Sequence, residues 1–79
     1  MLVCNGTVMI LVDKQPTLEE AQAFVNGYVE LLVLSKDEQI VINEEGLLKE
    51  LPINYWASLK SGRIIVGNVI LLKGKACWK

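Results

Sequence analysis

The order of apolar and polar positions predicts a strand followed by a short helix. The apolar, β-branched run Thr7–Val12 ends shortly before Pro16, which is typical of a buried strand. Thr17 and, three residues on, Glu20 form the pattern of a capping box, and apolar residues then recur on one side of a helix until Asn26-Gly27. These positions predict an amphipathic helix over residues 18–25.

A β-hairpin is predicted next. Tyr28–Leu34 has the aromatic and branched content of a strand covered on both faces, residues 35–38 are polar, and Gln39–Asn43 reads as the returning strand. Residues 47–51 favour a helix but are cut off by Pro52. We expect one or two turns there.

The last third predicts a second helix and a strand. Asn54 is a suitable N-cap for a helix over Tyr55–Ser61, with Gly62 at its end. We expect Trp56 to pack from this helix into the core. Arg63–Lys73 is apolar on both sides of Gly67 and Asn68, which predicts one bent strand or, alternatively, a two-residue hairpin turn.

The element order is therefore β-α-β-β-α-β, an α+β fold with a small mixed or antiparallel sheet and two short helices packed on one face. With 79 residues, the chain makes a single domain over residues 1–79, too small for a large enzyme core. No cofactor-binding motif is present, and neither nucleotide-binding glycine fingerprint occurs. We expect a protein without catalytic residues, metal or cofactor.

Histidine is absent, and the two cysteines, Cys4 and Cys77, have no Cys-x-x-Cys spacing. Whether they pair stays open, although free thiols in a cytoplasmic protein are favoured. The N-terminus lacks a basic region, and Asn5-Gly6 interrupts the apolar stretch before it reaches Val8–Val12. This run is far too short to cross a membrane, so we expect no membrane contact and a location in the cytoplasm.

Charge is unevenly distributed along the chain. Residues 1–50 carry all nine acids and three lysines, whereas residues 51–79 carry five bases and no acid. The basic third is able to offer an anion-binding surface, but the favoured interpretation is that opposite charges cancel within the fold or across a subunit contact. Nucleic acid is disfavoured, since basic and aromatic residues do not alternate.

Two groups of polar residues are candidate binding sites. The hairpin brings Tyr28 and Glu30 towards Asn43, Glu44 and Glu45, where carboxylates could bind a divalent cation for hydrolysis or support the turn structurally; we favour the structural role. At the end of the second helix, Lys60 and Arg63 could hold a phosphate group, together with Lys73. A solvated helix end is the favoured alternative.

Four motifs resemble those of a family of unknown function found mostly in bacteriophages, prophages and their hosts. They are Gly27-Tyr28-Val29-Glu30, Asn43-Glu44-Glu45-Gly46, Leu51-Pro52-Ile53-Asn54 and Ile65-Val66-Gly67-Asn68-Val69. Family members often carry an acidic residue at the position of Asn68. The resemblance implies a phage-borne accessory protein acting in the host cytoplasm, without implying an activity.

Apolar residues make up 52% of the chain, more than two helices and a small sheet are able to bury. Trp78 follows the last predicted element, so we expect it to need a partner. We therefore expect a homo-oligomer that also binds a host protein and so counters host defence or metabolism. The alternatives are an oligomeric sponge for a nucleotide-like anion and a metal-dependent hydrolase.

Overall fold

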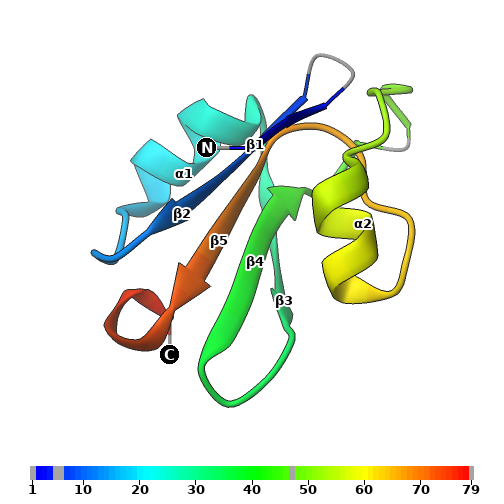
Figure 1. Cartoon of the computed structure of the whole chain (residues 1–79). Helices are drawn as coiled ribbons and strands as arrows, with labels where there is room; N and C mark the ends of the chain where they lie inside the picture. Colours follow the sequence, from blue (N-terminus) through cyan, green and yellow to red (C-terminus); the bar gives the residue numbers. More distant parts are fainter. Residues whose placement is uncertain (1, 5–6, 47, 79) are drawn as a thin grey trace.

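A five-stranded mixed sheet forms the centre of the molecule in the computed structural model, which describes residues 2–4, 7–46 and 48–78 (Figure 1). The sheet order is β1 (Leu2–Cys4), β2 (Thr7–Val12), β5 (Val69–Lys73), β4 (Glu38–Asn43) and β3 (Val29–Val33). The β2–β5 pair is parallel and the other neighbours are antiparallel. The helices are α1 (Leu18–Val25), α2 (Tyr55–Ser61) and the 3₁₀ turn η1 (Gly74–Ala76).

The α+β class and the predicted order are confirmed as β2-α1-β3-β4-α2-β5. Strand β1 was not predicted; it pairs with the first half of β2 at the edge of the sheet. The expected interruption at Asn5-Gly6 and the first residue of the 47–51 segment lie outside the described residues, while residues 48–50 form turns. No helix in the described part of the chain is long and apolar enough to span a membrane.

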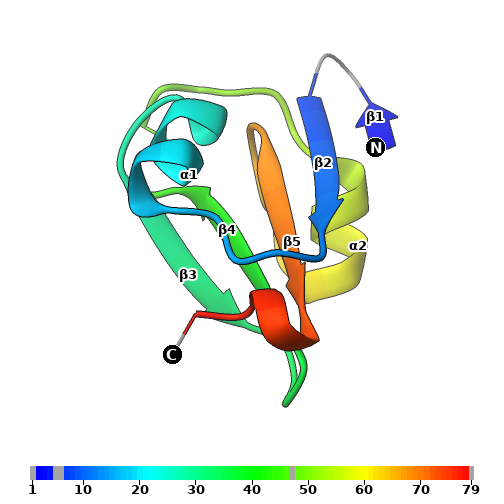
Figure 2. The ribbon, with the colours of Figure 1, turned by 90° about the vertical axis from the view of Figure 1, so that its left-hand side faces the viewer.

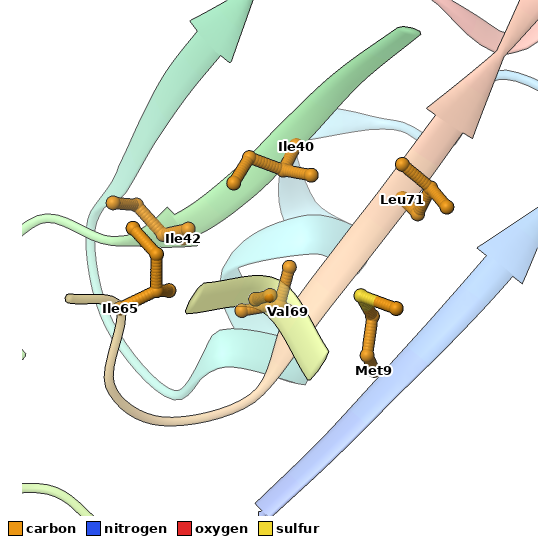
Figure 3. Packing of buried hydrophobic residues seen from close by; sticks show 7 residues of the cluster. Met9, Ile40, Ile42, Ile65, Val69 and Leu71 are labelled. Carbon is orange, nitrogen blue, oxygen red and sulfur yellow. The ribbon is translucent and has the colours of Figure 1, made fainter. Parts of the chain in front are cut away.

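The two helices lie on opposite faces of the sheet, so the expectation that they share one face is wrong (Figures 1 and 2). Side chains alternate between the faces of a strand, so the consecutive apolar residues 40–42 of β4 and 69–72 of β5 supply apolar side chains to both faces. One face packs with Ala57 of α2 through Met9, Ile40, Ile42, Ile65, Val69 and Leu71, whose side chains point towards one another in Figure 3. The other packs with α1 through Val41, Ile70 and Leu72. Because both faces of the sheet are apolar, each face is covered by one helix.

Both helix starts are confirmed by their caps. Thr17 Oγ1 accepts from the Glu20 amide at 3.1 Å and Glu20 Oε1 accepts from the Thr17 amide at 2.9 Å, which completes the capping box. Asn26 ends α1 in the left-handed region with φ 65°. At α2, Asn54 Oδ1 accepts from the Ala57 amide at 3.2 Å. Gly62 ends this helix with φ 76°, a conformation that glycine adopts at little cost.

The hairpin of residues 28–43 is confirmed, with Leu31 opposite Val41. However, β3 is an edge strand with exposed positions, so the expected cover on both faces is wrong. Strand β2 is likewise only partly buried. The bent strand predicted over Arg63–Lys73 is wrong in its first half, because β5 covers only Val69–Lys73 and Val66 forms an isolated bridge with Ile53. The hairpin alternative at Gly67-Asn68 is also wrong, because β5 pairs only with β2 and β4 within the described sheet.

Tryptophan placement reverses both expectations. Trp56 is 42% exposed, because Ala57 occupies the inward position of α2, so its expected core role is wrong. Trp78 packs against the α1 side of the core, and its indole Nε1 donates to Pro16 O at 3.1 Å. Its main chain also exchanges two 2.7 Å hydrogen bonds with the Gln39 side chain. Trp78 is therefore no sign of a partner; η1 folds the chain back so that it packs within the subunit.

Candidate functional site

The outward side of α2 is apolar. Leu59 lies three residues after Trp56 and four after Tyr55, so the three side chains share one side of the helix. All three are exposed, Leu59 to 78%. Ile53 before the helix and Ile64 after it are exposed as well. We call these five residues, Ile53, Tyr55, Trp56, Leu59 and Ile64, the α2 ridge.

Buried hydrogen bonds hold the ridge in place from below. Asn54 is fully buried, and its Nδ2 donates to Gly67 O at 2.9 Å and to Val8 O at 3.3 Å. Ser58 Oγ accepts from the Ile65 amide at 2.9 Å and donates to Ile65 O at 3.1 Å. These contacts tie α2 to β2 and to the segment before β5. The helical part of the ridge therefore sits on a hydrogen-bonded support rather than on a free loop.

In the predicted anion site, two lysines already form salt bridges with a carboxylate of the same chain. Lys60 Nζ lies 3.0 Å and Lys73 Nζ 3.3 Å from Glu38 Oε2, which joins the acidic and basic parts of the sequence. Arg63 is exposed and, within the part of the chain that the structure describes, makes no salt bridge. A phosphate at Lys60 would have to compete with Glu38, which argues against the sponge. The fold brings Lys60 and Lys73 together, as expected, but pairs them internally.

The hydrogen bond from Lys60 lowers the pKa of Glu38 below its ordinary value of 4.5, with a further contribution from Lys73. A carboxylate with a lowered folded pKa stabilises the fold fully above the unfolded value and loses that contribution as pH falls through the folded value. We therefore expect stability to decline below about pH 4.5. Glu38→Gln should flatten this decline in denaturation curves measured from pH 6 to pH 3, as expected when protonation is removed.

Asp37→Asn is the matched control, because it alters a neighbouring acid that makes no salt bridge within the described residues. An equal loss of pH dependence in both variants would contradict the assignment to Glu38. Because this carboxylate is close to solvent, added salt should reduce the effect.

Residues of the predicted carboxylate cluster point to different faces of the sheet. Asn43 is buried and reaches towards α1, where its Nδ2 donates to Val25 O at 3.0 Å, while its Oδ1 accepts from the Glu45 amide at 2.8 Å. Glu30 is exposed opposite Ile42, whose side chain packs on the α2 face. The Glu44 amide donates to Tyr28 O at 2.9 Å, so this contact is between main chains. Asn43 therefore has a structural role.

Among the described residues no group of three or more acidic, cysteine or histidine side chains is placed to hold a metal ion. Cys77 carries a free thiol that donates to Asp37 O at 3.3 Å, so it does not pair with Cys4. The side chain of Cys4 lies outside the description.

An open cleft of about 660 Å³ lies beside α1, and nothing in the sequence analysis pointed to it. Its apolar lining includes Ile10 and Val12 from β2, Phe24 from α1 and Ile70 from β5. Charged residues of the lining are Asp13, Lys14 and Glu20. Because these residues come from separate elements, only the folded chain brings them together. We call this concavity the α1 cleft.

A family model matches residues 1–77, almost the whole chain. The chain belongs to the family described as Domain of unknown function (DUF3846). Comparison with curated proteins and with solved structures gives no match. The expected membership of a family of unknown function is thus confirmed.

Proposed function

We propose that this DUF3846 protein is a non-enzymatic accessory protein that self-associates and binds a host protein, acting in the cytoplasm of a phage-infected cell. Its recognition surface is the α2 ridge. The observation that carries the proposal is the outward placement of Tyr55, Trp56 and Leu59 on a helix whose buried side is satisfied by Ala57.

Exposed residues of these types favour protein contact. Single apolar residues are common on surfaces, but a contiguous exposed group with two aromatic rings is typical of an interaction site. Tyrosine and tryptophan are also the residues that most often dominate binding free energy when they enter a partner's pocket. Burial of the ridge gains about 25 cal/mol for each Å² of apolar surface removed from water.

The support beneath the ridge favours binding as well. Asn54 fixes the start of the helix and Ser58 fixes its middle to buried main-chain groups, so the rings are presented on an ordered element. A preordered surface loses less conformational entropy on association than a loop does. The geometry thus supports recognition through side-chain packing, with no reacting group required.

We expect Tyr55→Ala and Leu59→Asp each to reduce host-protein binding about tenfold or more, since hot-spot truncation costs about 2 kcal/mol or more. Immobilised protein is exposed to bacterial lysate, and the captured proteins are quantified by mass spectrometry for each variant. Tyr28→Ala is the matched control, because Tyr28 is an exposed tyrosine on the hairpin, outside the ridge. Only proteins retained by the wild type and by Tyr28→Ala, and lost from both ridge variants, support the proposal. Identical captured sets for all four proteins would refute it.

A further inference from the structure

Helices α1 and α2 lie on opposite faces of the sheet (Figures 1 and 2). The α1 cleft lies beside α1 and the α2 ridge on α2, so these two surfaces belong to opposite faces. One is an apolar surface on the outside of a helix, and the other is an apolar hollow between α1 and the end of β2. This chain thus carries both an exposed apolar surface and a hollow with an apolar lining.

Charge around the ridge is positive. Residues 51–79, which include all of α2, contain no acid. Lys60 and Lys73 share the single carboxylate of Glu38, which leaves one positive charge in excess. Arg63, which follows the Gly62 cap of the helix, adds an exposed guanidinium. The ridge thus has a basic end.

Charge around the cleft is negative. Asp13 and Glu20 belong to its lining and Glu19 is exposed in the same first turn of α1, against one base, Lys14. Glu20 accepts the hydrogen bond of the capping box through Oε1, which keeps its carboxylate at the start of the helix. An apolar hollow beside acids suits an apolar surface beside bases.

We propose that the α2 ridge of one copy docks into the α1 cleft of a second copy, head to tail, with Arg63 facing Asp13 and Glu20. This inference rests on the proposed self-association and names the surfaces that produce it. The occupant is a second copy because the complementary charges are both present on this chain. In a symmetric contact of two ridges, Arg63 and Lys60 of one subunit would instead approach the same two basic residues of the other subunit. These like charges repel.

A head-to-tail contact leaves a free ridge on one terminal copy and a free cleft on the other. Such heterologous contacts produce closed rings or open chains, whereas a two-fold contact stops at the dimer. We expect the wild-type protein to form assemblies beyond the dimer at high concentration. Added salt should weaken them, since the paired charges lie close to solvent.

Mixing two variants tests the contact. Leu59→Asp damages the ridge and keeps the cleft, while Val12→Lys combined with Asp13→Lys damages the cleft, which both residues line, and keeps the ridge. By light scattering and analytical ultracentrifugation, each variant alone should be monomeric. An equimolar mixture should form a 1:1 dimer and nothing larger, because one intact ridge meets one intact cleft.

If the cleft variant alone still dimerises, the ridges contact each other and the inference is wrong. A wild-type protein that stays monomeric at several hundred micromolar also overturns it. Circular dichroism checks folding of each variant. Should the double variant unfold, the mixing experiment uses Arg63→Glu as the ridge variant and Asp13→Lys as the cleft variant. Each alone should weaken association about fivefold or more, and a mixture of the two should restore it. The cleft variant, whose ridge stays intact, should lose self-association and still capture host protein, which separates this inference from the proposed host binding.

Discussion

Asn54→Ala should lower the free energy of unfolding by about 3 kcal/mol, because it leaves several buried polar groups without partners. The side chain is fully buried and caps α2 through the Ala57 amide. It also donates to Gly67 O at 2.9 Å and to Val8 O at 3.3 Å. Urea or guanidinium denaturation, followed by circular dichroism, measures the loss.

Asn54→Asp separates the two roles of this residue. The carboxylate keeps an acceptor for the helix cap but removes the donor to Gly67 and Val8. We expect it to destabilise strongly as well, because the amide donor joins α2 to β2 and to the segment before β5. A variant as stable as the wild type would show that only the cap matters. Thr17→Ala, at an exposed cap, is the control and should cost about 1 kcal/mol.

Asn43→Ala should lower the free energy of unfolding by about 2 kcal/mol. Its Nδ2 donates to Val25 O at 3.0 Å at the end of α1, and its Oδ1 accepts from the Glu45 amide at 2.8 Å. The residue is 4% exposed, so water has little access to replace these bonds. The same denaturation experiment applies.

Glu44→Ala is the matched control for Asn43, because Glu44 is exposed and its recorded contact, the amide to Tyr28 O, is made by the main chain. It should change stability by less than about 0.5 kcal/mol. Equal losses for Asn43→Ala and Glu44→Ala would argue against the anchoring role. A loss confined to Asn43 would assign this motif to folding rather than to chemistry.

Three asparagines of the family-like motifs act in the same way. Asn68 Oδ1 accepts from the Val8 amide at 3.0 Å, and its Nδ2 donates to Phe24 O at 3.3 Å. With Asn43 and Asn54 it joins α1, α2 and β2 at the end of the sheet where β5 begins. An acidic residue at position 68 would keep the first contact and lose the second. Motifs that suggested binding residues thus hold the elements together.

Helix ends and the hairpin were predictable because their signals are local. The capping box at Thr17, the left-handed stop at Asn26 and the cap at Asn54 depend on residues within one turn of the chain. The hairpin register likewise follows from the short polar loop between two apolar runs. Strand β1 escaped prediction because three residues carry too little pattern.

The candidate sites depended on distant contacts. Lys60 was a reasonable anion ligand until the fold placed Glu38, 22 residues earlier, against it. Trp56 is exposed rather than buried, because Ala57 faces the sheet in its place. Trp78 packs against the core rather than needing a partner, because η1 turns the chain back towards Pro16. The α1 cleft combines residues from β2, α1 and β5 and has no local signature.

By itself the sequence determined the α+β class, the order of the six main elements, both helix caps and the hairpin, because short-range hydrogen bonds and hydrophobic periodicity specify them. Only the tertiary structure decided that the helices cover opposite faces, that Glu38 neutralises part of the basic segment, and that the ridge and the cleft face away from each other. The physical reason is that β4 and β5 are apolar on both sides: their pattern shows that two covers are needed, but long-range packing selects which helix covers which face.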